Sequence, residues 1–267
     1  MLDNEFNNVN VDLSNSTNGW QILFDSENIK GETNFITSKN SHLYANLEKL
    51  ILKTAEEDEN NQIPIDKIPE LDINIDEFIF NENELGQFNL LTNNTENGIN
   101  INNLSITKPG LNINAMGKWT SIDGIDHSDF KATLTADTIG NMLGTFSFDN
   151  ANIKNGQTTM EMNAHWLGTP MEFAMEKIDG ELDIKIDKGQ FLDIDPAAGR
   201  LFGLLSIQTL PRRLTLDFSD LFNKGFAFDN ITGNFSVQQG HAYTNNLEMT
   251  GPSADIIVSG RTGLSTE

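Results

Sequence analysis

Apolar and polar residues alternate along most of this chain, and the alternation constrains the fold more than any other feature. In a β-strand successive side chains point to opposite faces, so alternation gathers the apolar side chains of each strand on one face. The clearest stretches are LDINIDEF (71–78), LNINAMGKW (111–119), MEMNAHW (160–166), MEFAM (171–175), GELDIKID (180–187), RLTLDF (213–218) and GNFSVQQG (233–240). The pattern predicts an all-β protein.

Turn residues divide these stretches. Asn, Gly and Asp recur about every ten residues, as in a meandering sheet, so we expect about fifteen strands in antiparallel pairs. Three segments, 144–157, 180–191 and 233–243, each begin with glycine, alternate and reach a second glycine turn. They predict repeated hairpins, and hence an elongated, twisted sheet that grows by adding strands.

One longer stretch has helical spacing. Asp195 suits an N-cap, Pro196 suits the first helical position, and Pro211 prevents continuation. The apolar residues at helical spacing between them are Leu201, Leu204 and Leu205. They predict a short amphipathic helix near 196–208.

Smaller departures from the strand pattern complete the expected organisation. Helical turns are expected at 135–143, ended by Gly144, and at 220–224. The charged stretch 53–64 predicts a solvated loop and a soft boundary. Otherwise we expect residues 1–267 to form a single elongated unit.

Composition excludes several classes of function. With 39 acidic and 17 basic residues the formal net charge is −22, which opposes binding to nucleic acids and to anionic lipid surfaces. The absence of cysteine excludes disulfides, thiol nucleophiles and zinc–thiolate sites. No apolar run is long enough to span a bilayer, and the N-terminus resembles no secretion signal. We therefore expect a cytosolic protein or a portion of a larger one.

Motifs give little support to catalysis. The stretch SIDGIDHSDF (121–130) holds three aspartates and a histidine, which suit a metal or acid–base site, but its composition is better explained by a β-turn. Asp193 and Asp195 are near glycosidase spacing, but Asp195 is better explained as a helix cap. His42, His165 and His241 are isolated in sequence. We expect a protein that is not an enzyme, with no catalytic residue, metal or cofactor.

Patterning alone leaves two architectures open. Two alternating faces can meet as the core of a sandwich, which patterning favours, or one curled sheet can line an apolar trough.

Four motifs with nearly fixed spacing carry a family resemblance. They are G-R-L-x-G-L-L-S (199–206), L-P-R-R-L-x-L-D-F (210–218), G-F-x-F-D-x-I-x-G (225–233) and N-L-E-M-x-G-P (246–252). Through them residues 166–264 resemble the C-terminal region of the YhdP proteins, which belong with TamB to the AsmA-like group of bacterial envelope proteins. The upstream part is similar more weakly, through its alternating strands and the G-x-W at 117–119.

The resemblance implies a twisted sheet curled into a taco-like groove. It also implies a periplasmic protein of a Gram-negative bacterium, anchored in the inner membrane by segments that this chain lacks, that carries phospholipid towards the outer membrane. Phospholipid is then the expected partner, nucleic acid is not, and envelope protein partners are unspecified. The alternative is a β-scaffold of the envelope that docks partners and carries no lipid.

On this interpretation the apolar face contacts lipid tails. The expected contacts are Leu182, Ile184, Ile186, Leu201, Leu204, Leu205, Leu214, Leu216, Phe218, Phe235 and Val237. Arg212 and Arg213 point to opposite faces of an extended chain and are candidates for a phosphate contact or a structural latch. The other reading of these residues is an ordinary β-core with two surface arginines.

Overall fold

The structure is a computed structural model that describes residues 8–16, 18–37, 41–53, 64–145, 153–192, 226–252 and 255–264. These residues form one sheet in which the order of the strands follows the chain from β1 to β14. The sheet is open rather than closed into a barrel, which confirms the predicted all-β fold and agrees with a curled groove. Within the described ranges, no helix has the length and apolar character needed to cross a membrane.

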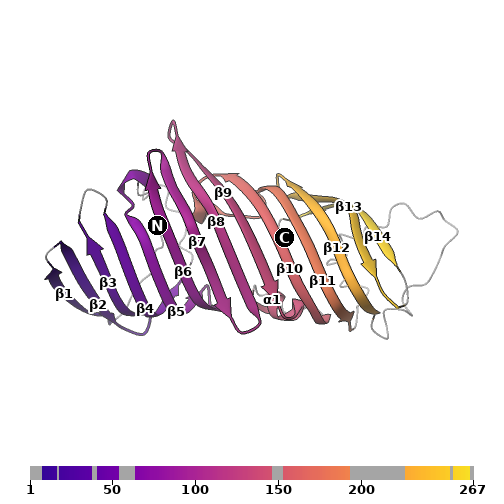
Figure 1. Ribbon diagram of the computed structural model, residues 1–267, viewed down its shortest axis with the longest axis horizontal. Coiled ribbons are helices and arrows are strands. Elements are labelled where there is room, and N and C mark those ends of the chain that lie inside the picture. The colour runs from indigo at the N-terminus through magenta and orange to yellow at the C-terminus, as the bar shows by residue number, and fades with distance from the viewer. Residues whose placement is uncertain are drawn as a thin grey trace. The chain divides into compact units, whose positions relative to one another are not determined.

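The chain divides into two compact units, Met1–Phe130 and Lys131–Glu267. The first contains β1 (Asn10–Ser16), β2 (Gly19–Asp25), β3 (Ile29–Ile36), β4 (His42–Leu52), the 3₁₀ turn η1 (Ile65–Lys67), β5 (Glu70–Phe80), β6 (Asn83–Thr95), β7 (Gly98–Lys108) and β8 (Leu111–Ile122). The boundary falls within β9 (Ile125–Ala136). The second contains α1 (Ile139–Thr145), β10 (Ile153–Leu167), the 3₁₀ turn η2 (Pro170–Glu172), β11 (Asp179–Phe191), β12 (Phe226–Gln238), β13 (His241–Thr250) and β14 (Ile256–Gly263). Figure 1 labels these strands and α1.

The pairing of β4 with β5 departs from the antiparallel meander. His42 pairs with Glu70 and Leu52 with Phe80 in a parallel register, whereas β1 to β4, β5 to β8 and β10 to β14 pair antiparallel. Parallel neighbours need a long crossover, because the chain must return to the same end of the sheet. The predicted loop at 53–64 falls within this crossover, and its residues 54–63 lie outside the described part of the chain.

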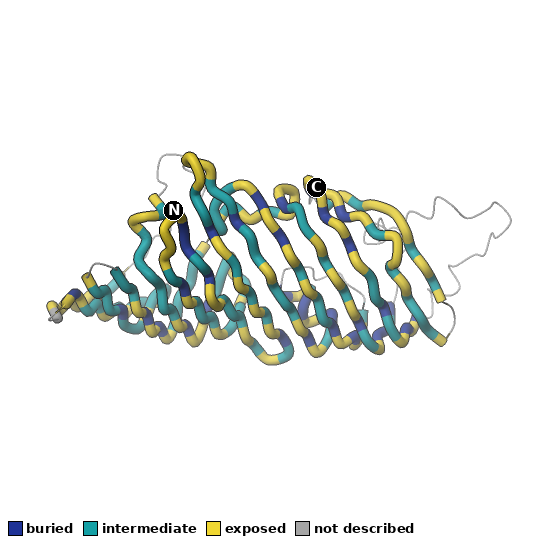
Figure 2. The backbone as a smooth tube through the Cα atoms, turned by 45° about the horizontal axis from the view of Figure 1, so that its top comes forward, coloured by how far each residue is buried: buried dark blue, intermediate teal, exposed yellow. Residues whose placement is uncertain are grey.

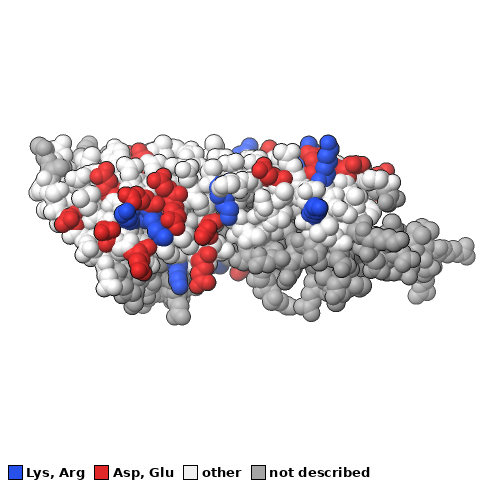
Figure 3. All heavy atoms as spheres, turned by 90° about the horizontal axis from the view of Figure 1, so that it is seen from below, with Lys and Arg blue, Asp and Glu red and all other residues white. Residues whose placement is uncertain are grey.

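The first unit has one apolar and one polar face, as alternation requires. Among its described residues, the core includes a cluster centred on Ala45, Leu47, Ile75 and Phe78 and another centred on Ile99, Ile101 and Trp119. Exposed ion pairs join neighbouring strands on the polar face, with Lys30 Nζ 2.6 Å from Glu48 Oε2 and Lys49 Nζ 3.1 Å from Glu77 Oε1. Figure 2 shows buried and exposed residues alternating along the strands, and Figure 3 shows acidic and basic side chains intermixed on the face it views.

The short helix α1 lies against the second unit's sheet. It begins after Thr138, whose Oγ1 accepts a hydrogen bond from the amide of Asn141 at 3.1 Å, and it buries Ile139 and Met142. The helix expected at 135–143 is therefore present but shifted, and it continues through Gly144 instead of ending there. The short amphipathic helix expected near 196–208 and the helical turn expected at 220–224 lie outside the described residues.

Two of the three predicted glycine turns are wrong. Asn155 and Gly156 lie within β10 and Lys188 and Gly189 within β11, and positive φ values at Asn155, Gly156 and Lys188 make a shared kink there instead of a hairpin. The pairing register is continuous across this kink. Only the third segment is a hairpin, which turns at Gln239 and Gly240 between β12 and β13.

The stretch MEFAM (171–175) is not a strand, although its residues alternate. Pro170 begins the turn η2, and Thr169 and Glu172 form a reciprocal capping box around it. Because both groups satisfy backbone donors at the start of a helical turn, this local structure prevails over alternation. The stretch belongs to the connection between β10 and β11.

Candidate functional site

An apolar face extends across β10 to β14 of the second unit. Because paired residues of neighbouring strands point to the same side, the register defines rows of side chains across the sheet. One row is Thr158, Ile186, Ile231, Met249 and Ile256; a second is Met160, Ile184 and Gly233; a third is Met162, Leu182 and Phe235; a fourth is Ala164, Gly180, Val237, Ala242 and Thr262. We call this surface the apolar face.

Side chains on the apolar face differ in how far protein atoms cover them. Ile186, Phe235 and Val237 are only 4%, 8% and 4% exposed, so they act as core residues. Leu182 and Ile184 on β11 are half-buried, as are Met160 and Met162 on the neighbouring strand β10. The centre of the face therefore keeps apolar surface that protein atoms do not cover.

Packed elements bound the apolar face at one end of the strands. The side chains of Ile139 from α1 and Ile186 both lie against Gly156, and a Cβ at Gly156 would stand 3.2 Å and 3.0 Å from their Cγ2 atoms. At this same end the rings of Phe191 and Phe228 lie 5.3 Å apart. Gly189 is opposite Phe228 in the register and leaves room for its ring.

An aromatic pair bounds the face at the other end. Trp166, 6% exposed, packs edge-on against Phe173 with ring centroids 5.3 Å apart. Its Nε1 donates a hydrogen bond of 2.9 Å to the carbonyl oxygen of Thr169. The half-buried centre thus lies between two fixed ends.

The opposite side of the same strands is polar. Along β11 the exposed residues Glu181, Asp183 and Lys185 alternate with those of the apolar face. The pKa of Asp187 lies below its ordinary value, because Lys185 Nζ approaches its carboxylate at 2.9 Å and Asn230 Nδ2 donates to it at 2.6 Å. The described charged side chains of β11 thus lie on the side opposite the apolar face or near the ends of the strand.

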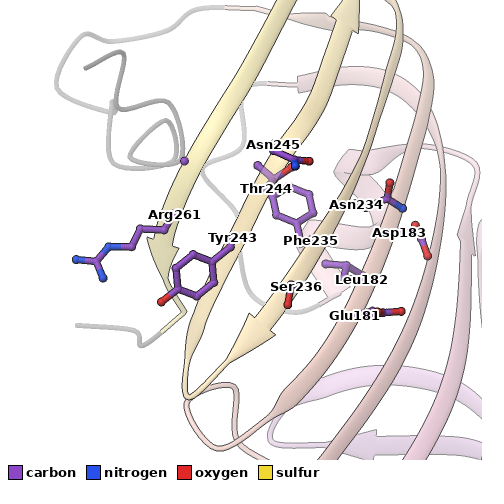
Figure 4. A pocket seen from close by; sticks show the side chains of 11 residues that line it. Glu181, Leu182, Asp183, Asn234, Phe235, Ser236, Tyr243, Thr244, Asn245 and Arg261 are labelled. Atoms are coloured by element: carbon purple, nitrogen blue, oxygen red, sulfur yellow. The ribbon is translucent and has the colours of Figure 1, made fainter. Parts of the chain in front are cut away.

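A hollow with a volume of about 700 Å³ lies over β11 to β14. It is lined by Glu181, Leu182, Asp183, Asn234, Phe235, Ser236, Tyr243, Thr244, Asn245, Gly260 and Arg261. Glu181, Ser236, Tyr243 and Arg261 pair successively across the strands and are exposed, so polar-side residues make most of this lining. Figure 4 shows the Arg261 side chain directed away from the other labelled residues, so among the described residues that line the hollow no cationic group converges on it as in a phosphate site.

The predicted tail contacts fall into two groups. The structure brings Leu182, Ile184, Ile186, Phe235 and Val237 together on the apolar face, while Leu201, Leu204, Leu205, Leu214, Leu216, Phe218, Arg212 and Arg213 lie outside the described residues. Met160 and Met162 lie in the rows of the apolar face but were not expected as contacts. Their signal was present, since MEMNAHW alternates.

The candidate catalytic stretch is a turn, as its composition predicts. Asp123 and Gly124 have φ values of 52° and 78° and connect β8 to β9 in a two-residue loop. Such left-handed pairs are typical of tight hairpins. Asp129 lies 3.5 Å from Lys118 Nζ, and nowhere in the described part of the chain do three acidic or histidine side chains gather as metal ligands.

Comparisons with known proteins agree with the resemblance in the sequence. The Intermembrane phospholipid transporter YhdP of Escherichia coli (strain K12) is 28% identical over 153 residues, which are 57% of this chain and 12% of that protein. This chain thus covers a small part of its relative's length, and no solved structure matches it. The family described as YhdP protein matches over residues 1–267. The chain therefore belongs to the YhdP family.

Proposed function

We propose that the apolar face binds the acyl chains of phospholipids and shields them from water while the lipids move between membranes. The half-buried side chains of the two central rows, Met160, Met162, Leu182 and Ile184, are the observation that carries this proposal. These side chains offer apolar surface on a hydrogen-bonded sheet, and none of the residues paired with them across β10 to β12 is charged.

The energetic reason for such a surface is the cost of exposing lipid tails. Transfer of a methylene group into water costs about 0.8 kcal/mol, so two tails with about thirty methylenes cost about 24 kcal/mol. An apolar surface that covers the tails removes most of this barrier. No residue has to be catalytic, because the protein changes only the solvation of the lipid. We accordingly propose a carrier that is not an enzyme.

Family membership supports the setting of this activity. The E. coli relative is described as an intermembrane phospholipid transporter. This supports the proposal that the chain is a periplasmic groove segment of a longer protein, anchored in the inner membrane of a Gram-negative bacterium. The direction of the proposed transport is from the inner to the outer membrane. The scaffold alternative differs in one respect, since it requires an apolar face that contacts protein only.

Lipid retention by matched variants tests the proposal. Ile184→Ser removes apolar surface from the centre of the face, and Lys185→Ser changes its neighbour, which points to the polar side. We expect the phospholipid that co-purifies with the protein, measured by native mass spectrometry, to fall about tenfold in the first variant and to stay unchanged in the second. Equal retention in both variants, or a wild-type protein without lipid, would favour the scaffold.

A further inference from the structure

The connection between β10 and β11 exposes an unusual amount of apolar surface. Residues 168–178, which we call the rim loop, contain Met171, Phe173 and Met175, whose exposed fractions are 78%, 42% and 48%. Leu167, the last residue of β10, is 67% exposed immediately before it. Clusters of large exposed apolar side chains on one short segment mark contact surfaces rather than ordinary loops.

The rim loop is held in place by specific contacts, so this exposure is a built feature. Glu172 Oε2 accepts a hydrogen bond of 2.6 Å from the amide of Thr169, and the amide of Lys177 donates to the carbonyl of Ala174 at 2.9 Å. On the other flank, Gly240 of the β12–β13 turn lies against Glu176. A Cβ added to Gly240 would stand 2.9 Å from the Cα of Glu176. A fixed loop loses little conformational entropy when it binds a partner.

Its apolar surface is continuous with the apolar face. Phe173 packs on Trp166, and Trp166 follows Ala164 at the end of β10 on the side that also carries Met160 and Met162. An acyl chain that reaches the half-buried centre from the rim loop would therefore remain against apolar side chains throughout.

Charge distinguishes between the surfaces that such a loop can meet. The charged residues of the rim loop are Glu172, Glu176 and Lys177, and the Glu172 carboxylate is already bonded within the loop. The whole chain carries a net charge of −22, so an anionic surface is repelled. Flexible methionine side chains adapt to a fluid apolar phase.

From these observations we propose that the rim loop inserts Met171, Phe173 and Met175 into the surface of a zwitterionic phospholipid bilayer. The inference rests on the proposed function for its purpose, since it identifies where the carrier meets a membrane, but its test is independent of lipid binding by the apolar face. Neither the alternation of the strands nor the family match assigns a role to these residues.

Vesicle flotation with the full chain tests the proposal. The variant Met171→Ser/Met175→Ser removes both methionines of the loop, and Met116→Ser on β8 removes a methionine that is 58% exposed elsewhere. We expect the wild type and Met116→Ser to float with phosphatidylcholine vesicles, at low and high salt alike, and the loop variant to lose binding at least about tenfold. Wild-type protein that stays unbound, or a loop variant that binds as well as the wild type, would overturn the inference. Binding that needs anionic lipid and disappears in salt would do the same.

A second measurement reports insertion directly. Because the chain has no cysteine, a single one at Met171→Cys or Met116→Cys can carry the environment-sensitive fluorophore NBD. We expect a blue shift with phosphatidylcholine vesicles from position 171 and none from position 116; equal spectra at both positions would contradict insertion. A blue shift at 171 without vesicles that grows with protein concentration would instead identify a second copy of the chain as the occupant.

Lipid content separates this inference from the proposed function. Native mass spectrometry on the same samples should find the co-purified phospholipid unchanged in the loop variant. Protein that floats with vesicles but carries no lipid would contradict the proposed function alone, and protein that carries lipid but does not float would contradict the rim-loop inference alone.

Discussion

Substitution of Gly189 by alanine should destabilise the second unit through a single steric contact. Gly189 lies in β11 opposite Phe228 of β12, and a Cβ at this position would stand 2.2 Å from Phe228 Cζ and 2.8 Å from Cε1. Its φ is outside the left-handed region, so alanine adds no backbone strain there. The whole effect of Gly189→Ala must therefore come from displacement of the phenylalanine ring.

The magnitude follows from how little the ring can move. Phe228 is 3% exposed and packs against Phe191 at 5.3 Å, so the ring can yield only by disturbing a second buried side chain. Overpacking of this kind costs about 1–3 kcal/mol. We expect Gly189→Ala to lower the free energy of unfolding, measured by urea denaturation, by that amount without a change in m-value.

Two further variants make the reasoning refutable. Gly260→Ala on β14 places a Cβ with no atom within 4 Å, and we expect it to change stability by less than about 0.5 kcal/mol. Phe228→Leu shortens the opposing side chain, so Gly189→Ala should cost less in this background, with a coupling of about 1 kcal/mol. The steric contact would be refuted if Gly189→Ala and Gly260→Ala lowered the free energy of unfolding equally. It would also be refuted if the effect of Gly189→Ala were the same with Phe228 and with Leu at position 228.

Other predictions concern an ion pair and the helix. Because Lys185 and Asn230 lower the pKa of Asp187 in the folded state, this carboxylate stabilises the protein above its ordinary pKa of 3.8, and the stability is lost as the pH falls through the lowered value. Urea midpoints between about pH 5 and pH 2 should therefore fall less steeply for Asp187→Asn than for the wild type, and parallel curves would contradict this. Ile139→Ala should lower the free energy of unfolding by about 2–4 kcal/mol, because Ile139 is 7% exposed and packs beside Gly156. Asn141 is exposed on the same helix, so Asn141→Ala should lower it by less than about 0.5 kcal/mol. Similar values for the two variants in urea unfolding would show that α1 does not pack on the sheet.

Alternation predicted the faces of the sheet well, because strand geometry fixes the side of the sheet to which each side chain points. Once β11 is a strand, Leu182, Ile184 and Ile186 must share one side and Asp183 and Lys185 the other. The same argument holds for β5 and β10. The sequence therefore predicted both the all-β fold and the central part of the apolar face.

Features that depend on distant contacts were not predictable in this way. The alternation of β5 is the same in a parallel and an antiparallel pair, so nothing in LDINIDEF indicates its parallel pairing with β4. The Asn-Gly pair at 155–156 suits a turn as well as a kink, and only its position beneath Ile139 and opposite β11 makes it a kink. The exposure of Met171 and Met175 likewise follows from the capping of η2, which the alternation of MEFAM conceals.

Photocrosslinking along β11 tests the central claim most directly. A photoreactive amino acid is placed in turn at each position from 181 to 187, and the purified protein is irradiated with its co-purified phospholipid and examined by mass spectrometry. We predict lipid adducts with a period of two, from Leu182 and Ile184 but not from Glu181, Asp183 or Lys185, because only the first pair lies on the half-buried apolar face. Adducts at all positions alike, or at none while lipid is present, would contradict a lipid-binding apolar face.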